Sequence, residues 1–174
     1  MIAAVVLAAG ASTRFGSPKQ RLLLAPVLER VRAARSLGEI VVVLGAHDVQ
    51  TDARVVRCAE WKHGPGASLR CGLAALGDGV EAAVVVLADG PELAPAAVVR
   101  LVERWNGEPV LAAAYGGARG HPVLLARAAW DAVPDAGART LEAVLIACDD
   151  LGSPGDVDTV CDLPEGLRDR EREH

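Results

Sequence analysis

The 174-residue sequence has few aromatic residues and no marked excess of charge. Aromatic residues make up 3% of the chain while hydrophobic residues make up 51%, so the core must be built from Val, Leu and Ala. A hydrophobic content this high excludes disorder over most of the length. A chain of this size buries roughly 70% of its unfolded surface, so one domain can fold without a disulfide or a structural metal.

A clustered basic face and a long hydrophobic run are also absent. The net charge is -5 and the pI is near 5.4, which argues against a nucleic acid or an anionic membrane as a partner. The apolar run 2–9 is short and has no basic residue before it, unlike a signal peptide or a membrane-spanning helix. We therefore expect a cytoplasmic protein.

The four cysteines form no C-x-x-C pair and have no histidines at the spacing of zinc ligands. Neither a metal knuckle nor a thioredoxin-type redox site is indicated. The prediction is that Cys58, Cys71, Cys148 and Cys161 are reduced structural thiols.

Apolar runs alternate with amphipathic segments along the chain. Strands are predicted at 2–7, 40–44, 55–58, 82–88, 110–114, 123–125 and 156–160, and helices at 28–37, 68–76, 95–105, 126–132 and 139–147. This alternation predicts a single three-layer, Rossmann-like α/β domain over residues 1–164, with a mostly parallel sheet. Residues 165–174 are mostly Arg, Asp and Glu, and we expect them to form a frayed, solvated tail.

Ligands of such sheets bind beyond the carboxyl ends of the strands, and the first strand leads into a turn of small residues. Small side chains let backbone N–H groups approach an anion, and Arg14 and Lys19 add positive charge. The spacing fits neither a P-loop nor a G-x-G-x-x-G turn. A triphosphate would suit this turn, although an ordinary loop with two solvated cations explains the residues equally well.

A single aspartate, Asp89, follows the apolar strand 82–88 and precedes Gly90 and Pro91. A carboxylate at the end of a buried strand offers the hard oxygen ligands that magnesium prefers. Without other information, a turn or helix-capping aspartate is the commoner explanation of this pattern.

One long motif, Leu7-Ala8-Ala9-Gly10-x-Ser12-x-Arg14-x-Gly16-x-x-Lys19, resembles the signature of the MobA-like nucleotidyltransferases. The Leu-Ala-Ala-Gly form is similar to the branch that contains molybdenum cofactor cytidylyltransferase. Further blocks resemble the family in the same order along the chain. They are Trp61-x-x-Gly64-x-Gly66-x-Ser68-Leu69-x-x-Gly72-Leu73, Asp89-Gly90-Pro91, Gly120-His121-Pro122-Val123 and Asp156-Val157-Asp158-Thr159.

The resemblance implies a fold of the nucleotide-diphospho-sugar transferase type and a role for each block. Asp89 and Asp158 would hold Mg²⁺, and His121 would lie near the acceptor, although a lone histidine in a turn is more often structural. Arg14, Lys19 and Asp89 would be the catalytic residues. The nucleotide would be bound by Leu7, Ala8, Ala9, Gly10, Ser12, Arg14 and Lys19 at its phosphates, and by Gly66 and Ser68 beside its base.

The activity implied is transfer of a nucleoside monophosphate, CMP favoured, from the triphosphate to a phosphorylated acceptor such as molybdopterin cofactor, with release of pyrophosphate. A molybdoenzyme is then a further partner that the resemblance suggests. Two alternatives stay open: the same chemistry on another phosphorylated acceptor, and a non-catalytic protein that handles a nucleotide or pterin for a molybdoenzyme. A dinucleotide-dependent oxidoreductase is disfavoured because the G-x-G-x-x-G turn is missing.

Overall fold

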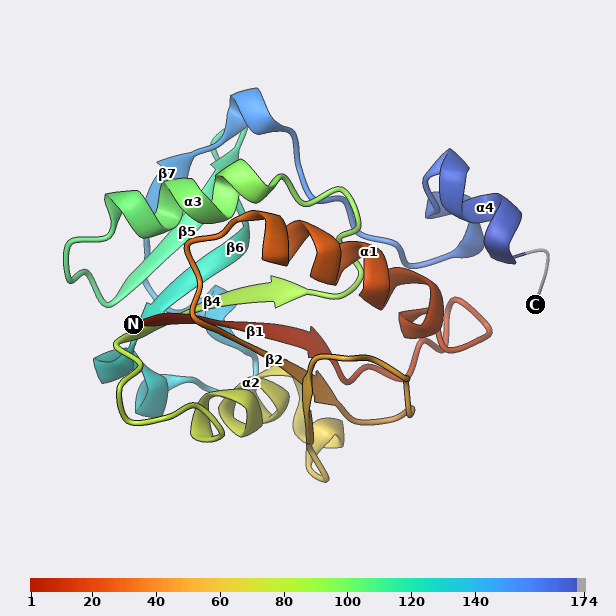
Figure 1. Ribbon diagram of the computed structural model, residues 1–174, viewed down its shortest axis with the longest axis horizontal. Helices are drawn as coiled ribbons and strands as arrows, with labels where there is room; N and C mark the ends of the chain where they lie inside the picture. The colour runs from red at the N-terminus through yellow and green to blue at the C-terminus, as the bar shows by residue number, and fades with distance from the viewer. Residues whose placement is uncertain (172–174) are drawn as a thin grey trace.

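A seven-stranded sheet forms the middle layer of the computed structural model, which describes residues 1–171 (Figure 1). The strands are β1 (Ile2–Ala8), β2 (Glu39–Leu44), β3 (Arg54–Arg57), β4 (Ala82–Leu87), β5 (Val110–Tyr115), β6 (Ala118–Ala126) and β7 (Val144–Ala147). Their order is β3-β2-β1-β4-β6-β5-β7, and only β6 runs antiparallel to its neighbours. The predicted Rossmann-like fold with a mostly parallel sheet is confirmed.

Helices cover both faces of this sheet, which is why β1 and β4 are apolar on both sides. On one face lie α1 (Gln20–Ala33) and α3 (Pro95–Arg104), and on the other lies α2 (Pro65–Ala74) with the 3-10 helix Arg127–Ala132 (Figure 1). Each face has its own aliphatic core. Helix α2 approaches the sheet closely because Gly72 faces it: a Cβ there would lie 2.6 Å from Val5.

The antiparallel strand β6 results from a tight hairpin with β5. Gly116 and Gly117 form the turn with φ of 59° and 76°, a left-handed conformation that glycine adopts at little cost. The strand predicted at 123–125 is thus the end of a longer one. Its first half carries Arg119 and His121 towards the carboxyl end of β4.

Two predicted elements in the last third of the chain are wrong. Residues 139–147 are not a helix: a short 3-10 helix (Ala138–Thr140) is followed by β7, which pairs with β5 at the edge of the sheet. Short apolar runs do not distinguish helix from strand by periodicity. Residues 156–160 form no strand, because Val157 packs beside Phe15 and Leu163 instead of joining the sheet, and a 3-10 helix begins at Val160.

Helix α1 begins eight residues before its predicted start at Leu28 and includes Pro26. The predicted tail is helical instead of frayed where it is described, because Glu165–Glu171 form helix α4, and residues 165–169 are mostly exposed, as expected of a solvated segment. The side chain of Leu167 contacts the cluster formed by Phe15, Leu23, Val157 and Leu163, and α4 therefore lies beside the start of α1 (Figure 1). Residues 172–174 of the predicted tail lie outside the described range. The division of the chain at residue 164 stays a prediction.

The prediction of four reduced cysteines is wrong for one pair. Cys58 follows β3 and Cys71 lies in α2, and they form a disulfide with their Cα atoms 5.8 Å apart. Folding brings them together because α2 packs on the sheet next to β2 and β3. Cys148 and Cys161 are free. Within residues 1–171 no helix is long and apolar enough to cross a membrane.

Candidate functional site

A cavity of about 280 Å³ lies where the parallel strands β1 and β4 end. Both strands point to the same edge, on the right in Figure 1, so the segments that follow them meet there. The cavity is lined by Leu7, Ala8, Gly10, Ala11, Ser12, Thr13, Arg14, Lys19, Gln20, Ala88, Asp89 and Asp158. The predicted phosphate turn and both predicted metal ligands therefore contribute to a single cavity.

The turn after β1 is braced by Gln20, a residue that the sequence analysis missed. Its amide group donates to the Gly10 carbonyl at 2.7 Å and accepts from the Ser12 hydroxyl at 2.8 Å. The Ser12 hydroxyl in turn accepts from the backbone N–H of Lys19 at 3.3 Å. Gln20 is only 3% exposed, and the signal for it is a polar side chain on the buried face of a helix.

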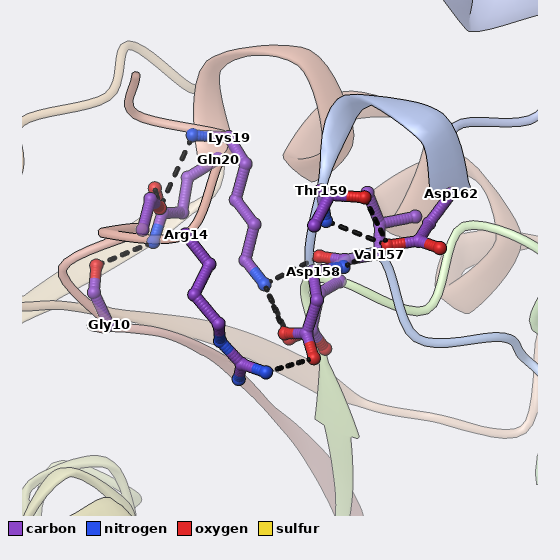
Figure 2. Close-up of polar contacts among 10 residues, drawn as sticks. Gly10, Arg14, Lys19, Gln20, Val157, Asp158, Thr159 and Asp162 are labelled. Atoms are coloured by element: carbon purple, nitrogen blue, oxygen red, sulfur yellow. Dashed lines mark hydrogen bonds and ion pairs between the residues drawn. The ribbon is translucent and has the colours of Figure 1, made fainter. Parts of the chain in front are cut away.

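Arg14 and Lys19 of the turn extend towards the segment that carries Asp158, as Figure 2 shows. The Lys19 ammonium lies 3.1 Å from Asp89 Oδ2 and 3.7 Å from Asp158 Oδ1, and it donates to the Val157 carbonyl at 2.6 Å. The Arg14 guanidinium lies 2.6 Å from Asp158 Oδ2. The Lys19 side chain is 13% exposed and that of Arg14 is 73% exposed, so the lysine pair is screened much less by water.

The position of Asp158 depends on the segment that carries it. The backbone N–H of Val157 donates to the carbonyl of Asp89 at 3.0 Å, which joins this segment to the end of β4. The carboxylate of Asp162 accepts from the N–H groups of Asp158 and Thr159 at 3.2 and 2.8 Å (Figure 2). Asp158 is therefore held opposite the phosphate turn by backbone contacts on both of its sides.

A third carboxylate, that of Asp156, lies near those of Asp89 and Asp158. Partial burial raises its pKa, and the negative charges of Asp89 and Asp158 raise it further. Asp156 also lines a wider cavity of about 560 Å³ that continues from the phosphate turn past Ser68. The resemblance gave Asp156 no role, because its repeat with Asp158 does not by itself reveal which carboxylate faces the site.

His121 lies on β6, beside the carboxyl end of β4. Burial lowers its pKa to about 4, an effect opposed by Asp89 and reinforced by Arg119. The imidazole is therefore neutral at pH 7 and can take part in hydrogen bonds without adding charge. It borders a second, mainly apolar cavity of about 280 Å³ that also contains Arg139. Arg119 fixes the wall of that cavity by donating to the carbonyls of Ala138 and Leu141.

The two residues predicted beside the base are placed differently. Ser68 lines the wider cavity, although it is only 4% exposed. Gly66 does not line it. Its backbone N–H donates to the Asp135 carbonyl at 2.9 Å, and a Cβ at this position would lie 1.7 Å from the Pro134 carbonyl oxygen. Gly66 is thus explained by backbone packing.

The donor set fits a divalent cation that also binds phosphate. Among residues 1–171, no three His, Cys, Asp or Glu side chains are grouped as a complete metal site. Magnesium, however, commonly takes one or two carboxylates from the protein and the rest of its oxygens from phosphate and water. Asp89 and Asp158 suit that arrangement, because one cationic atom, Lys19 Nζ, already lies near both of them.

Comparison with known proteins agrees with this geometry. The MobA-like NTP transferase domain matches residues 4–151, and the chain belongs to this family of nucleotidyltransferases. Rv0371c from Mycobacterium tuberculosis H37Rv is similar over 92% of this chain and 94% of its own, with 30% identity and a TM-score of 0.75.

Two further solved structures are similar, and no curated protein matches in sequence. The complex of Rv0371c with manganese has 28% identity and a TM-score of 0.71, with 92% and 94% of the two chains covered. CMP:2-keto-3-deoxy-manno-octonic acid synthetase complexed with CTP has 13% identity and a TM-score of 0.70, with 99% of both chains covered, and therefore shows the fold alone.

Proposed function

We propose that this nucleotidyltransferase transfers CMP from CTP to a phosphorylated acceptor such as molybdopterin cofactor, with Mg²⁺ as its metal, and releases pyrophosphate. One observation carries the proposal. Two cations and two carboxylates, delivered by three distant segments of the chain, surround one cavity beyond the ends of β1 and β4. CTP is favoured by the Leu-Ala-Ala-Gly turn, which resembles the cytidylyltransferase branch of the family.

Nucleotidyl transfer to a phosphate requires that the reactants be positioned and that their negative charge be neutralised. The acceptor phosphate is already an anion, so no strong general base is needed when its oxygen attacks the α-phosphorus and pyrophosphate leaves. Arg14, Lys19 and the N–H groups of the turn stabilise the departing charge, and Asp89 with Asp158 would hold the metal. Bound Mg²⁺ would supply Lewis-acid stabilisation of the phosphate oxygens. The manganese complex of Rv0371c supports a divalent metal in a relative.

The cavity beside His121 supports an acceptor that has both a phosphate group and an apolar part. The cavity beside His121 has walls of Leu69, Val85 and Leu87, and Arg139 at its edge provides a positive charge. The acceptor would lie here, and we propose a cytoplasmic location with a molybdoenzyme as the receiver of the product. Product analysis with molybdopterin cofactor and with sugar phosphates distinguishes this acceptor from the alternatives.

The decisive test is the Asp89→Asn variant, assayed for pyrophosphate release with CTP, acceptor and Mg²⁺. Loss of the carboxylate charge should lower turnover by at least about 100-fold, the usual scale for losing one electrostatic contribution to a transition state. Triphosphate binding should persist. Asp131→Asn is the matched control, because Asp131 is exposed and outside the cavities described. Turnover of Asp89→Asn at the level of this control would contradict the metal assignment.

The base is identified by thermal unfolding with CTP, GTP, ATP or UTP, each with magnesium or with a chelator. A triphosphate present at ~100 times its dissociation constant stabilises the folded state by about 2.7 kcal/mol. We expect the melting temperature to rise with CTP and magnesium, and not with the other three triphosphates or with the chelator. A rise with CTP but no pyrophosphate release with any acceptor would favour the non-catalytic handling protein.

A further inference from the structure

Two of the three hydrogen-bond donors on the Lys19 ammonium are already engaged in this structure. An ammonium group has three donors. One is directed at Asp89, one at the Val157 carbonyl, and Asp158 lies within 4 Å of the same nitrogen. Its side chain is 13% exposed, so these contacts are largely shielded from water. The lysine therefore lies between the two carboxylates that are assigned to the metal.

The charges of the four ion-paired residues balance, and Asp156 beside them adds one further carboxylate. Arg14 and Lys19 contribute two positive charges, and Asp89 and Asp158 contribute two negative ones. A divalent cation that entered alone would meet two cations at its ligands, and a triphosphate that entered alone would meet two carboxylates. A triphosphate that carries its metal avoids both repulsions, because each group exchanges one partner for another of the same sign.

We propose that Lys19 is a stand-in cation: it lies between the two carboxylates that would hold the metal, and it moves to the phosphates only when metal and triphosphate arrive together. This inference rests on the proposed function for the identity of the site. It adds a property that the function does not require, namely that Lys19 opposes binding of the metal by itself. Arg14 contributes less to this opposition, because its side chain is 73% exposed and its pair with Asp158 is screened.

The test is a titration of the full-length protein with Mn²⁺ in the absence of nucleotide, followed by the electron paramagnetic resonance signal of free Mn²⁺. Lys19→Met removes the charge and keeps the length of the side chain. We expect Mn²⁺ to bind this variant about ten-fold more tightly than the wild type, which corresponds to about 1.4 kcal/mol. The same variant should bind CTP with Mn²⁺ more weakly than the wild type, because a phosphate contact is lost.

Arg104→Met is the control, because it removes a positive charge from an exposed position at the end of α3, outside the cavities described. Its affinity for Mn²⁺ should equal that of the wild type. Lys19→Gln repeats the test with a neutral side chain that still donates to the Val157 carbonyl, in case Lys19→Met does not fold. Circular dichroism and melting temperature verify the fold of each variant.

Equal or weaker Mn²⁺ binding by a folded Lys19 variant would overturn the inference. This outcome is distinct from failure of the proposed function, which would be seen as a wild-type protein that neither binds CTP with metal nor releases pyrophosphate. A stand-in cation predicts that the variant binds Mn²⁺ alone more tightly and CTP with Mn²⁺ more weakly. A lysine that merely supports the fold would not change the two affinities in opposite directions.

Discussion

Gly66 offers a test of whether the start of α2 is fixed by packing or only by ligand contact. In Gly66→Ala the new Cβ would lie 1.7 Å from the Pro134 carbonyl oxygen, 2.7 Å from its carbon and 2.9 Å from Asp135 Cα. All three are backbone atoms, so no side-chain rotation relieves the overlap. The Cβ–oxygen distance has to reach about 3.4 Å for an ordinary contact, and α2 or the 134–135 segment has to move.

Overpacking of this kind costs roughly 1–3 kcal/mol, and in a domain of this size each kcal/mol lowers the melting temperature by about 2–4 °C. Thermal unfolding without nucleotide should therefore show a fall of several degrees. Gly166→Ala is the matched control: Gly166 is likewise the second residue of a helix, but no atom lies within 4 Å of its added Cβ. Equal melting temperatures for Gly66→Ala and this control would refute the packing explanation.

Two further predictions concern pH and redox state. The pKa of His121 is lowered by burial to about 4 against an ordinary 6.5, so its neutral form contributes about 3 kcal/mol of stability that is complete above pH 6.5 and is lost as the pH falls to 4. Urea unfolding at pH 7 and pH 4.5 should show a smaller loss in His121→Asn than in the wild type, and an equal loss would contradict this account. The disulfide between Cys58 and Cys71 closes a short loop and should stabilise the folded state by about 3 kcal/mol. A reductant should therefore lower the stability of the wild type and leave the stability of Cys71→Ser unchanged. Unfolding curves with and without dithiothreitol, and thiol counts on the unfolded wild type, measure this difference.

The sequence predicted the central parallel strands β1, β2 and β4 because they are largely buried and carry no competing pattern. The run 82–88, for example, differs from the observed β4 by one residue. The meeting of Lys19 with Asp89 was also predictable, because segments that follow parallel strands meet at one edge of the sheet. The edge strand β7 was not predictable, because Val144 and Leu145 are half exposed and apolar and polar residues do not alternate along it.

Other features depend on contacts that no local pattern encodes. Gln20 is recognisable only once the turn folds back onto the first residues of α1, where its amide bonds both Gly10 and Ser12. The disulfide likewise follows from the packing of α2 on the sheet, and the cysteine spacing alone matches no standard motif. Contacts between segments that are distant in the sequence, such as these two, are what the sequence pattern could not predict.

The final segment of the chain has a role in the site that its composition conceals. The family match ends at residue 151, yet Asp158 lies beyond it and reaches the cavity with the help of Val157 and Leu163, which pack against Phe15 and Leu23. Phe15 belongs to the phosphate turn itself. The same small cluster therefore positions both sides of the cavity, the cations of the turn and one of their carboxylates. A change in the packing of this cluster would alter the distance between Lys19 and Asp158 without touching either residue, and the affinity for metal and triphosphate would change together.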